Sequence, residues 1–303
     1  MQAEGAGLGL AHAGRLGNAR PMGTFAQDIV VEPVGPGRYA AVLDESWNLV
    51  PLPQGGVVTS LALRAASDAV ADPSHQLRSS TTTFAGQVRP GELEIEVTVL
   101  RHGRSATQAT ASIRNVGAPA GAFVTAVFGT SRRGPSFVDL TMPEVAPPER
   151  CPSGRAAPPE GVEADLPPPF WTRVEGRLAL GHDWWEDFEL TTSDRATWLR
   201  FDDPPIDPEG ALDPLGLLTL ADRMPGAVQE RIGRQEERWF APSADLTVHF
   251  FAPLTTPWVL AHDRARWADD GWASGECTLW SEDGTLVGYA TQMMLFTYPF
   301  ADG

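Results

Sequence analysis

The sequence repeats one pattern of strands and turns. Residues 79–128 and 245–296 each contain an apolar strand that ends in phenylalanine, then a turn and alternating strands separated by glycine-bearing turns. The offset between the copies is nearly constant, because Phe84 matches Phe250 and Phe128 approximately matches Phe296. Solenoids need about three or more repeat units. Two copies therefore predict a duplicated domain, and such a fold can place one active site where its halves meet.

The composition fits a soluble globular protein and excludes several classes. The chain has 303 residues, of which 42% are hydrophobic and 20% charged, and this balance is typical of a protein with a packed core. No apolar run approaches the roughly 18 residues of a membrane helix, so we expect no membrane span. The net charge of -16 argues against a nucleic-acid partner, whose groove needs clustered cations.

The basic residues and the cysteines narrow the chemistry further. The chain contains no lysine, which excludes a Schiff-base lysine and a P-loop lysine. A phosphate on a ligand must therefore meet arginine or backbone N–H groups, and Arg101, Arg104 and Arg264 are candidates near predicted turns. Cys151 and Cys277 lack metal or redox spacing, so we interpret them as free thiols of a cytoplasmic protein, with a disulfide as the alternative.

Shifts in composition divide the chain into four segments. Residues 1–21 are rich in glycine and alanine and lack the apolar stretch of a signal peptide, so we expect a disordered extension. Residues 141–170 are rich in proline, which forbids regular strand pairing, and we interpret them as a linker. This places a first domain at residues 22–140 and a second at residues 171–303.

The two predicted domains share one order of elements. The first has a hairpin within residues 26–45, a helix over residues 55–70 that two glycines open and Asp72-Pro73 stops, and then a run of strands. A helix followed by a meander of long antiparallel strands, made twice, indicates an α+β fold in which each sheet wraps one helix. The strands of the first domain are expected near residues 77–88, 91–102, 104–116 and 120–130. The second domain is expected to have strands near residues 171–180, 184–190 and 197–202, a helix near 211–224, and strands up to 298.

Short motifs in both halves resemble a known family. They are Trp47-Asn48, Gly55-Gly56 and Arg101–Ser105 in the first half, and Ala221-Asp222, Ser243–Phe250 and Ala290–Gln292 in the second. Their order and spacing over residues 24–298 resemble the acyl-CoA thioesterase II family. The resemblance implies a double hotdog fold, in which two tandem α+β domains each wrap an antiparallel sheet around one long helix. It also implies an acyl-CoA substrate, no cofactor and association as a homo-oligomer.

Asp222 is the first candidate for catalysis. It shares the apolar edge of the second predicted helix with Leu218, whereas a typical aspartate lies on the surface. In proteins that the chain resembles, the matching aspartate activates the water that attacks the thioester carbonyl. This role fits a carboxylate base whose pKa is held closer to neutral pH by partial burial. Asp68, near the end of the first helix, has no evident partner and is interpreted as a surface residue.

Three polar residues of the second half are candidates for orienting the water. Gln292 lies among apolar neighbours, and its amide can both donate to a carboxylate and accept from water, as the resemblance implies. The family has a hydroxyl residue, usually threonine, at the position that Ser243 occupies. Thr247 lies four residues further, on the same face of a regular strand, so either hydroxyl fits. Ordinary outward-facing strand residues are the alternative for all three.

Gly55 and Gly56 are the candidates for binding the thioester oxygen. Two glycines at a helix start permit a tight turn, which is their ordinary role. Their N–H groups also lie at the positive end of the helix, where developing negative charge is stabilised. In a duplicated fold, this helix start and Asp222 could meet between the halves, which would explain why one half alone carries the aspartate.

The sequence lacks the motifs of other common catalytic and metal sites. The six histidines show no metal-binding spacing, so we expect no metal, and there is no G-x-S-x-G nucleophile elbow. The aromatic segment at residues 181–187 fits either an acyl channel or a packed core. Two alternatives to a thioesterase stay open. One is an acyl-CoA hydratase or dehydratase, which needs a histidine near a helix, and the other is a non-catalytic protein that binds acyl-CoA or lipid.

Overall fold

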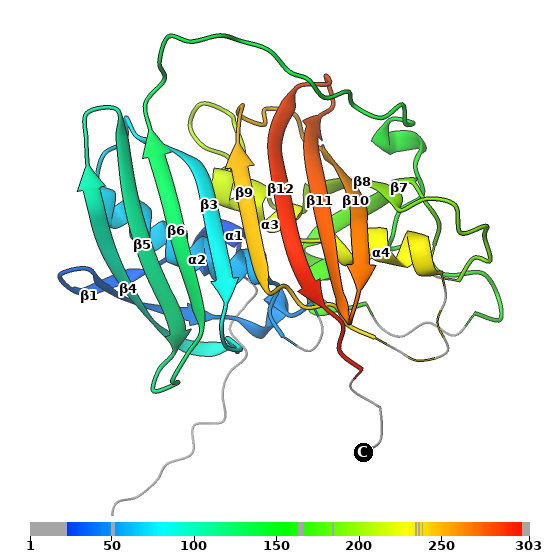
Figure 1. Ribbon diagram of the computed structural model, residues 1–303, viewed down its shortest axis with the longest axis horizontal. Coiled ribbons are helices and arrows are strands. Elements are labelled where there is room, and N and C mark those ends of the chain that lie inside the picture. The colour runs from blue at the N-terminus through cyan, green and yellow to red at the C-terminus, as the bar shows by residue number, and fades with distance from the viewer. Residues whose placement is uncertain are drawn as a thin grey trace, which may run out of the picture.

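Twelve antiparallel strands form one sheet in the computed structural model, which describes residues 23–49, 52–162, 167–183, 185–233, 235, 237 and 239–298 (Figure 1). The expected extension at residues 1–21 lies outside the described residues. The first half contributes β1 (Glu32–Gly35), β2 (Arg38–Leu43), β3 (Gln76–Phe84), β4 (Gly91–His102), β5 (Ala106–Asn115) and β6 (Ala122–Gly129). The second half contributes β7 (Val174–Leu180), β8 (Asp194–Phe201), β9 (Asp245–Phe250), β10 (Val259–Asp269), β11 (Trp272–Ser281) and β12 (Leu286–Leu295).

The strand order shows the duplication that the repeat predicts. The order is β1-β2-β4-β5-β6-β3-β9-β12-β11-β10-β8-β7, so each half has the same arrangement and the two meet edge to edge. The seam, as we call this meeting line, is the antiparallel pair of β3 and β9, in which Thr81 lies opposite Thr247. One continuous hydrogen-bonded sheet therefore carries residues of both halves to the same place.

The helices cover one face of this sheet (Figure 1). The helix α2 (Gly55–Val70) has the predicted bounds and ends at Ala71, whose left-handed backbone stops it. It packs beside α3 (Pro214–Ala221), and both helices bury apolar side chains against the sheet in one core. The other two described α-helices are α1 (Phe25–Asp28) and α4 (Pro225–Ile232). None of the described helices is long and apolar enough to cross a membrane.

The helix predicted over residues 211–224 is wrong in its bounds. Pro214 lies in the first turn of α3, where its missing N–H is not needed, and α3 ends at Ala221. Pro225 then starts α4 as a separate helix. The chain leaves the helical conformation between Ala221 and Pro225. Asp222 therefore caps the end of α3 instead of lying within a helix.

Two other predicted elements differ from the structure. The strand near residues 184–190 is wrong, because residues 185–190 have no regular structure and Trp184 lies outside the described residues. The strand beside β7 is β8, which starts at Asp194. The hairpin predicted within residues 26–45 is present as β1 and β2, but its first residues form α1.

The proline-rich segment covers the outer face of the second half. Met142 and Val145 pack against a cluster that includes Trp198, and the Trp198 indole donates a hydrogen bond of 2.9 Å to the Ala146 carbonyl. Cys151 belongs to this outer cluster, whereas Cys277 lies in the core on the inner face. Both cysteines are free thiols, as expected, and both are buried. The inner face is thus left to the helices and to the site described below.

Leu218 of α3 tests whether the halves fold as one unit. Its side chain is fully buried in the shared core, so Leu218→Ala should lower the free energy of unfolding by about 2–5 kcal/mol. Because the sheet is continuous across the seam, denaturant unfolding followed by tryptophan fluorescence should show one shifted transition. Two transitions, only one of them shifted, would mean that the halves unfold independently.

Candidate active site

The predicted residues Asp222, Ser243, Gln292 and Gly56 meet at the seam. Asp222 is buried, with 6% of its surface exposed, and its Oδ2 accepts a hydrogen bond of 2.9 Å from the Gly56 N–H at the start of α2. Its Oδ1 accepts from the Gln292 amide at 2.9 Å and from the Ser243 hydroxyl at 3.3 Å. The Gln292 amide also donates to Ser243. One carboxylate is thus held by donors from both halves of the chain.

The neighbouring strands set the positions of Ser243 and Gln292. Gln292 faces the inner side of β12 and is almost fully buried. Ser243 precedes β9 and pairs with Met294, which follows Gln292 by two residues on β12. Asp245 fixes this approach, because its carboxylate accepts a hydrogen bond of 2.8 Å from the Met293 N–H. The pairing brings the Ser243 hydroxyl to the inner face, next to the Gln292 amide.

Thr247 does not join this group. The side chains of β9 alternate, so Leu246 and Val248 point into the core while Thr247 points to the outer face. Its hydroxyl shares a hydrogen bond of 3.0 Å with Thr81 across the seam. The expectation that Ser243 and Thr247 lie on one face is wrong, because Ser243 lies outside the regular strand. Of the two hydroxyl groups, the structure places only that of Ser243 beside Asp222.

Gly55 and Gly56 allow α2 and α3 to approach each other closely. A Cβ atom on Gly55 would lie 2.9 Å from the Asp222 Oδ2, and one on Gly56 would lie 2.9 Å from the Thr219 Cα. No larger residue fits at either position without displacing these neighbours. The sequence analysis expected the Gly56 N–H to meet a thioester oxygen. In this structure it donates instead to the Asp222 carboxylate.

Gln54 is a positioning residue that the sequence prediction missed. Its side-chain oxygen caps α2 by accepting from the Val57 N–H at 3.0 Å. Its amide nitrogen donates to the carbonyls of Thr219, at 2.7 Å, and Asp222, at 3.0 Å. One buried side chain thus ties the start of α2 to the end of α3. Glutamine is an uncommon helix cap, and its partners are distant in sequence, so only the unusual residue before Gly55-Gly56 could have signalled it.

The surroundings of Asp222 set its protonation. Burial raises the pKa of Asp222, and the hydrogen bonds from Gly56, Ser243 and Gln292 oppose this rise because they stabilise the ionised form. The orientation of the Gln292 amide follows from the same contacts, since its nitrogen must face the carboxylate. Its oxygen is buried and has no hydrogen-bond partner among the described residues. A carboxylate of raised pKa beside an unused acceptor can bind a water molecule and remove its proton.

Other residues singled out in the sequence lie elsewhere. Arg101 and Arg104 lie at the turn between β4 and β5, which is near the C-terminal end of α2 and so far from Gly56. Arg264 forms an ion pair with Asp194. Asp68 is exposed, but it is not without a partner. Together with burial, its hydrogen bond raises the pKa of Tyr39 to about 12. In the aromatic segment, His182 binds Glu230 of α4 at 3.0 Å.

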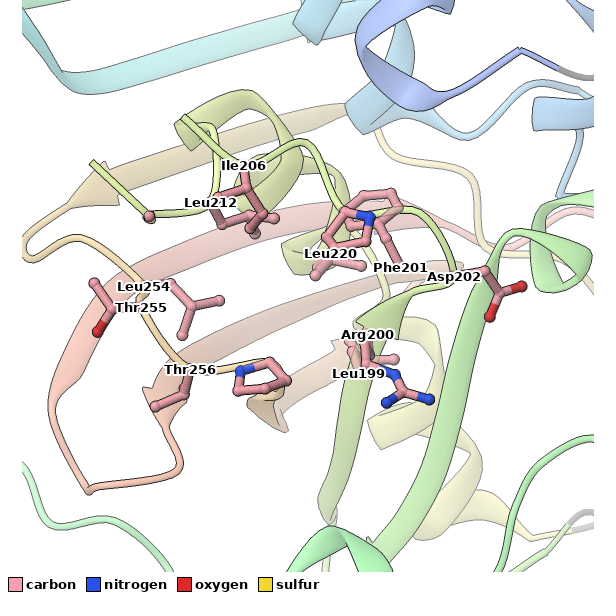
Figure 2. A pocket seen from close by; sticks show the side chains of 13 residues that line it. Leu199, Arg200, Phe201, Asp202, Ile206, Leu212, Leu220, Leu254, Thr255 and Thr256 are labelled. Atoms are coloured by element: carbon pink, nitrogen blue, oxygen red, sulfur yellow. The ribbon is translucent and has the colours of Figure 1, made fainter. Parts of the chain in front are cut away.

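A cavity of about 460 Å³ lies on another side of α3 (Figure 2). Its apolar lining includes Leu220, which is two residues before Asp222, together with Phe201 and Leu254. None of the side chains or amides that bind Asp222 lines it. Within the described part of the chain, no cluster of His, Cys, Asp and Glu could hold a metal ion. The group around Asp222 is therefore the candidate active site.

Comparisons with known proteins identify the family of both halves. A family model for the acyl-CoA thioesterase N-terminal domain matches residues 43–129, and one for the C-terminal domain matches residues 148–296. A search of curated proteins finds no match to the sequence.

Two solved structures show the fold. A conserved hot dog protein of unknown function from Alicyclobacillus acidocaldarius superposes with a TM-score of 0.74 at 23% identity, covering 91% of this chain and 98% of that chain. An acyl-CoA thioesterase II from Mycobacterium marinum superposes with a TM-score of 0.72 at 21% identity, covering 92% of this chain and 100% of that chain. The predicted double hotdog fold is confirmed.

The contacts of Gln54 with the end of α3 should contribute to the stability of the fold around Asp222. Gln54→Leu removes the cap of α2 and both hydrogen bonds to the end of α3, leaving buried carbonyl groups unpaired. We expect a loss of about 2–4 kcal/mol in the free energy of unfolding, measured with urea. The control Gln87→Leu changes an exposed glutamine and should shift stability by less than about 0.5 kcal/mol. Equal effects of the two substitutions would contradict the positioning role.

Proposed function

The chain belongs to the acyl-CoA thioesterase family and is a thioester hydrolase, and we propose that it hydrolyses acyl-CoA to a free carboxylic acid and CoA by means of a water that Asp222 activates. The observation that carries this proposal is the buried carboxylate of Asp222 at the seam, which accepts hydrogen bonds from Gly56, Ser243 and Gln292. A base with these partners needs neither a nucleophilic side chain nor a metal to begin hydrolysis.

The contacts of Asp222 define how the water would be held. One O–H of the water donates to the Asp222 carboxylate and the other to the unpaired oxygen of Gln292, which leaves a lone pair directed at the thioester carbon. Ser243 keeps the carboxylate in place through its own hydrogen bond. As the water oxygen bonds to the carbonyl carbon, its proton passes to Asp222. The C–S bond then breaks, and the departing CoA sulfur takes that proton.

The start of α2 supports the charges of this reaction. The backbone N–H groups of Gly55 and Gly56 both stabilise the ionised Asp222, and they form the positive end of α2. When Asp222 takes the proton, its carboxylate no longer holds the Gly56 N–H as strongly. We propose that this amide then faces the negative charge that develops on the thioester oxygen. The same amide would thus serve the base first and the oxyanion afterwards.

The alternatives from the sequence have less support. A hydratase or dehydratase would need a histidine beside the base, and among the described residues no histidine contacts Asp222. A non-catalytic role does not fit membership in a family of thioester hydrolases.

We also propose a cytoplasmic location and a homo-oligomer. The two free cysteines support the location. The support for association is a pair of exposed apolar side chains, Phe123 and Val127, on the outer face of β6.

Asp222→Asn should abolish most of the activity. Asparagine keeps the size of the side chain and can still accept from Gly56, but it cannot take a proton from water. We expect kcat to fall by about 10²–10⁴-fold, measured as CoA release from a panel of acyl-CoA substrates. The control Asp68→Asn changes an exposed aspartate outside the site and should keep wild-type rates. An inactive wild type across the panel, or an unimpaired Asp222→Asn, would refute the proposal.

Ser243 should set the acidic limb of the pH profile. The base works only when ionised, so kcat/KM rises with pH through the pKa of Asp222, which burial raises. Ser243→Ala removes a donor that stabilises the carboxylate, so the pKa of Asp222 rises further and the acidic limb moves to higher pH. Ser243→Thr keeps the hydroxyl, and its limb should stay in place. A limb that moves to lower pH in Ser243→Ala would contradict this assignment.

A further inference from the structure

Buried polar atoms without hydrogen-bond partners gather in the interior of the second half. Among the described residues, ten buried side-chain atoms lack a partner. Six of them belong to four residues, which we call the polar interior: Thr197 Oγ1, Arg223 Nε and Nη1, both carboxylate oxygens of Asp263, and Gln292 Oε1. Native proteins pair nearly all buried polar groups, so a cluster of this kind needs a reason.

The polar interior extends from the candidate active site into the second half. On the inner face, Gln292 lies opposite Gly275 of β11, and Cys277, two residues further, lies opposite Asp263 of β10. With about 4.8 Å between strands and about 3.4 Å per residue, the Cα atoms of Gln292 and Asp263 are about 12 Å apart. Thr197 faces the same side from β8. These side chains lie along one diagonal of the inner face, which runs from Gln292 on β12 across β10 to β8.

Arg223 spans this path. Its backbone follows Asp222 directly, and the next residue, Met224, packs on Gly275, where an added Cβ would lie 2.8 Å from the Met224 Cβ. The central carbon of the Arg223 guanidinium lies 4.9 Å from the centroid of the Trp171 ring, and the group interacts electrostatically with Asp263 and Cys277. Its side chain thus runs from the base toward Asp263.

Arg223 and Asp263 carry opposite charges but do not bind each other directly. Asp263 is fully buried, and no ion pair within 4.0 Å joins the two among the described residues. Burial disfavours both charged forms, lowering the pKa of Arg223 and raising that of Asp263, while the charge of each opposes the shift of the other. The Cys277 thiol also contacts the Asp263 carboxylate, but this carboxylate has further lone pairs. These lone pairs and the unpaired donors of Arg223 are available to a group that lies with them.

The first half has an apolar interior at the matching positions. The offset that matches Phe84 with Phe250 also matches Val97 with Asp263 and Ala126 with Gln292. Val97 and Ala126 belong to the hydrophobic core. The same fold therefore packs without polar groups here, and the polar residues occur in the half that carries Asp222. This distribution points to a ligand rather than to folding as their purpose.

We propose that the polar interior recognises the acyl chain, and that Arg223 and Asp263 select acyl-CoA substrates with a hydroxyl group in mid-chain. A hydroxyl accepts from the Arg223 guanidinium and donates to the Asp263 carboxylate, so one group satisfies both. A carboxylate on the chain would meet the charge of Asp263, and an ammonium group would meet that of Arg223. An unsubstituted chain leaves both unpaired. The inference rests on the proposed hydrolysis at Asp222.

The distance of Asp263 from Gln292 sets the position of the hydroxyl. The thioester carbon must lie beside the water that Asp222 and Gln292 hold, whereas Asp263 lies about 12 Å further along the inner face by the strand geometry. A hydroxyl on the carbons next to the thioester would not reach Asp263. The selected hydroxyl is therefore several carbons away from the thioester.

The test compares acyl-CoA substrates of one chain length. The chains are unsubstituted, hydroxylated next to the thioester, hydroxylated in mid-chain, or carboxylated at the end, and kcat/KM is measured from CoA release. For the wild type we expect the mid-chain hydroxyl to exceed the unsubstituted chain by about tenfold or more, because sites built for a hydroxyl discriminate strongly against its loss.

The matched variant is the double substitution Arg223→Met with Asp263→Leu. Removing both charges together avoids leaving one buried charge alone, which would destabilise the fold. The ratio of the two kcat/KM values should fall to about one, and a general loss of folding or catalysis does not move this ratio. Arg132→Met, at an exposed position, is the control and should keep the wild-type ratio.

The results separate a failure of the proposed hydrolysis from a failure of the proposed selectivity for a mid-chain hydroxyl. If the wild type hydrolyses no acyl-CoA, the proposed function itself fails. If it hydrolyses the panel without preferring the mid-chain hydroxyl, or if the double variant keeps the preference, the hydrolysis stands and this inference is overturned. A preference for the carboxylated chain would also overturn it, since Arg223 would then act as a site for an anion.

Discussion

The hydrogen bond between the Gly56 N–H and the Asp222 carboxylate connects the two halves at the point where we propose the chemistry. It requires α2 and α3 to approach closely, which the absence of a Cβ on Gly55 and Gly56 permits. Gln54 fixes the same approach through carbonyl groups at the end of α3. The base is therefore not a property of the second half alone. Its position and its pKa depend on a helix start that the first half provides.

A duplicated fold has a second place where a helix start meets the other helix, and there the chain has an ion pair instead of a buried base. At the start of α3, Asp213 caps the helix by accepting from the Leu215 N–H at 2.9 Å and also binds Arg64 of α2. An ion pair thus occupies the place that corresponds to the contact of Gly56 with Asp222. The two ends of the α2–α3 contact have diverged, one toward a buried carboxylate with raised pKa and the other toward a partly exposed salt bridge.

The sequence predicted features that depend on local signals and missed those that depend on distant contacts. The bounds of α2 followed from Gly55-Gly56 and Asp72-Pro73, which act within the chain next to them. The predicted helix over residues 211–224 was too long, because Pro214 inside it marks the start of a helix and Pro225 just after it starts another. The grouping of Asp222, Ser243 and Gln292 came from resemblance to a family, and no local pattern contains it. The meeting of the Gly56 helix start with Asp222 followed from the duplication, but the direct hydrogen bond between them did not. The contacts of Gln54 were out of reach, because they join residues more than 160 positions apart.

Burial has opposite consequences for the base and for the polar interior. At Asp222 it raises the pKa, and hydrogen bonds from Gly56, Ser243 and Gln292 oppose this rise because they stabilise the ionised form. At Arg223 and Asp263 the same burial leaves charges with unused donors and acceptors. An acyl chain bound here would keep water away from these groups, which strengthens their electrostatic contacts. A substrate hydroxyl that satisfies Arg223 and Asp263 would therefore help to hold the thioester against the water of Asp222, so that recognition deep in the second half and catalysis at the seam act on the same bound chain.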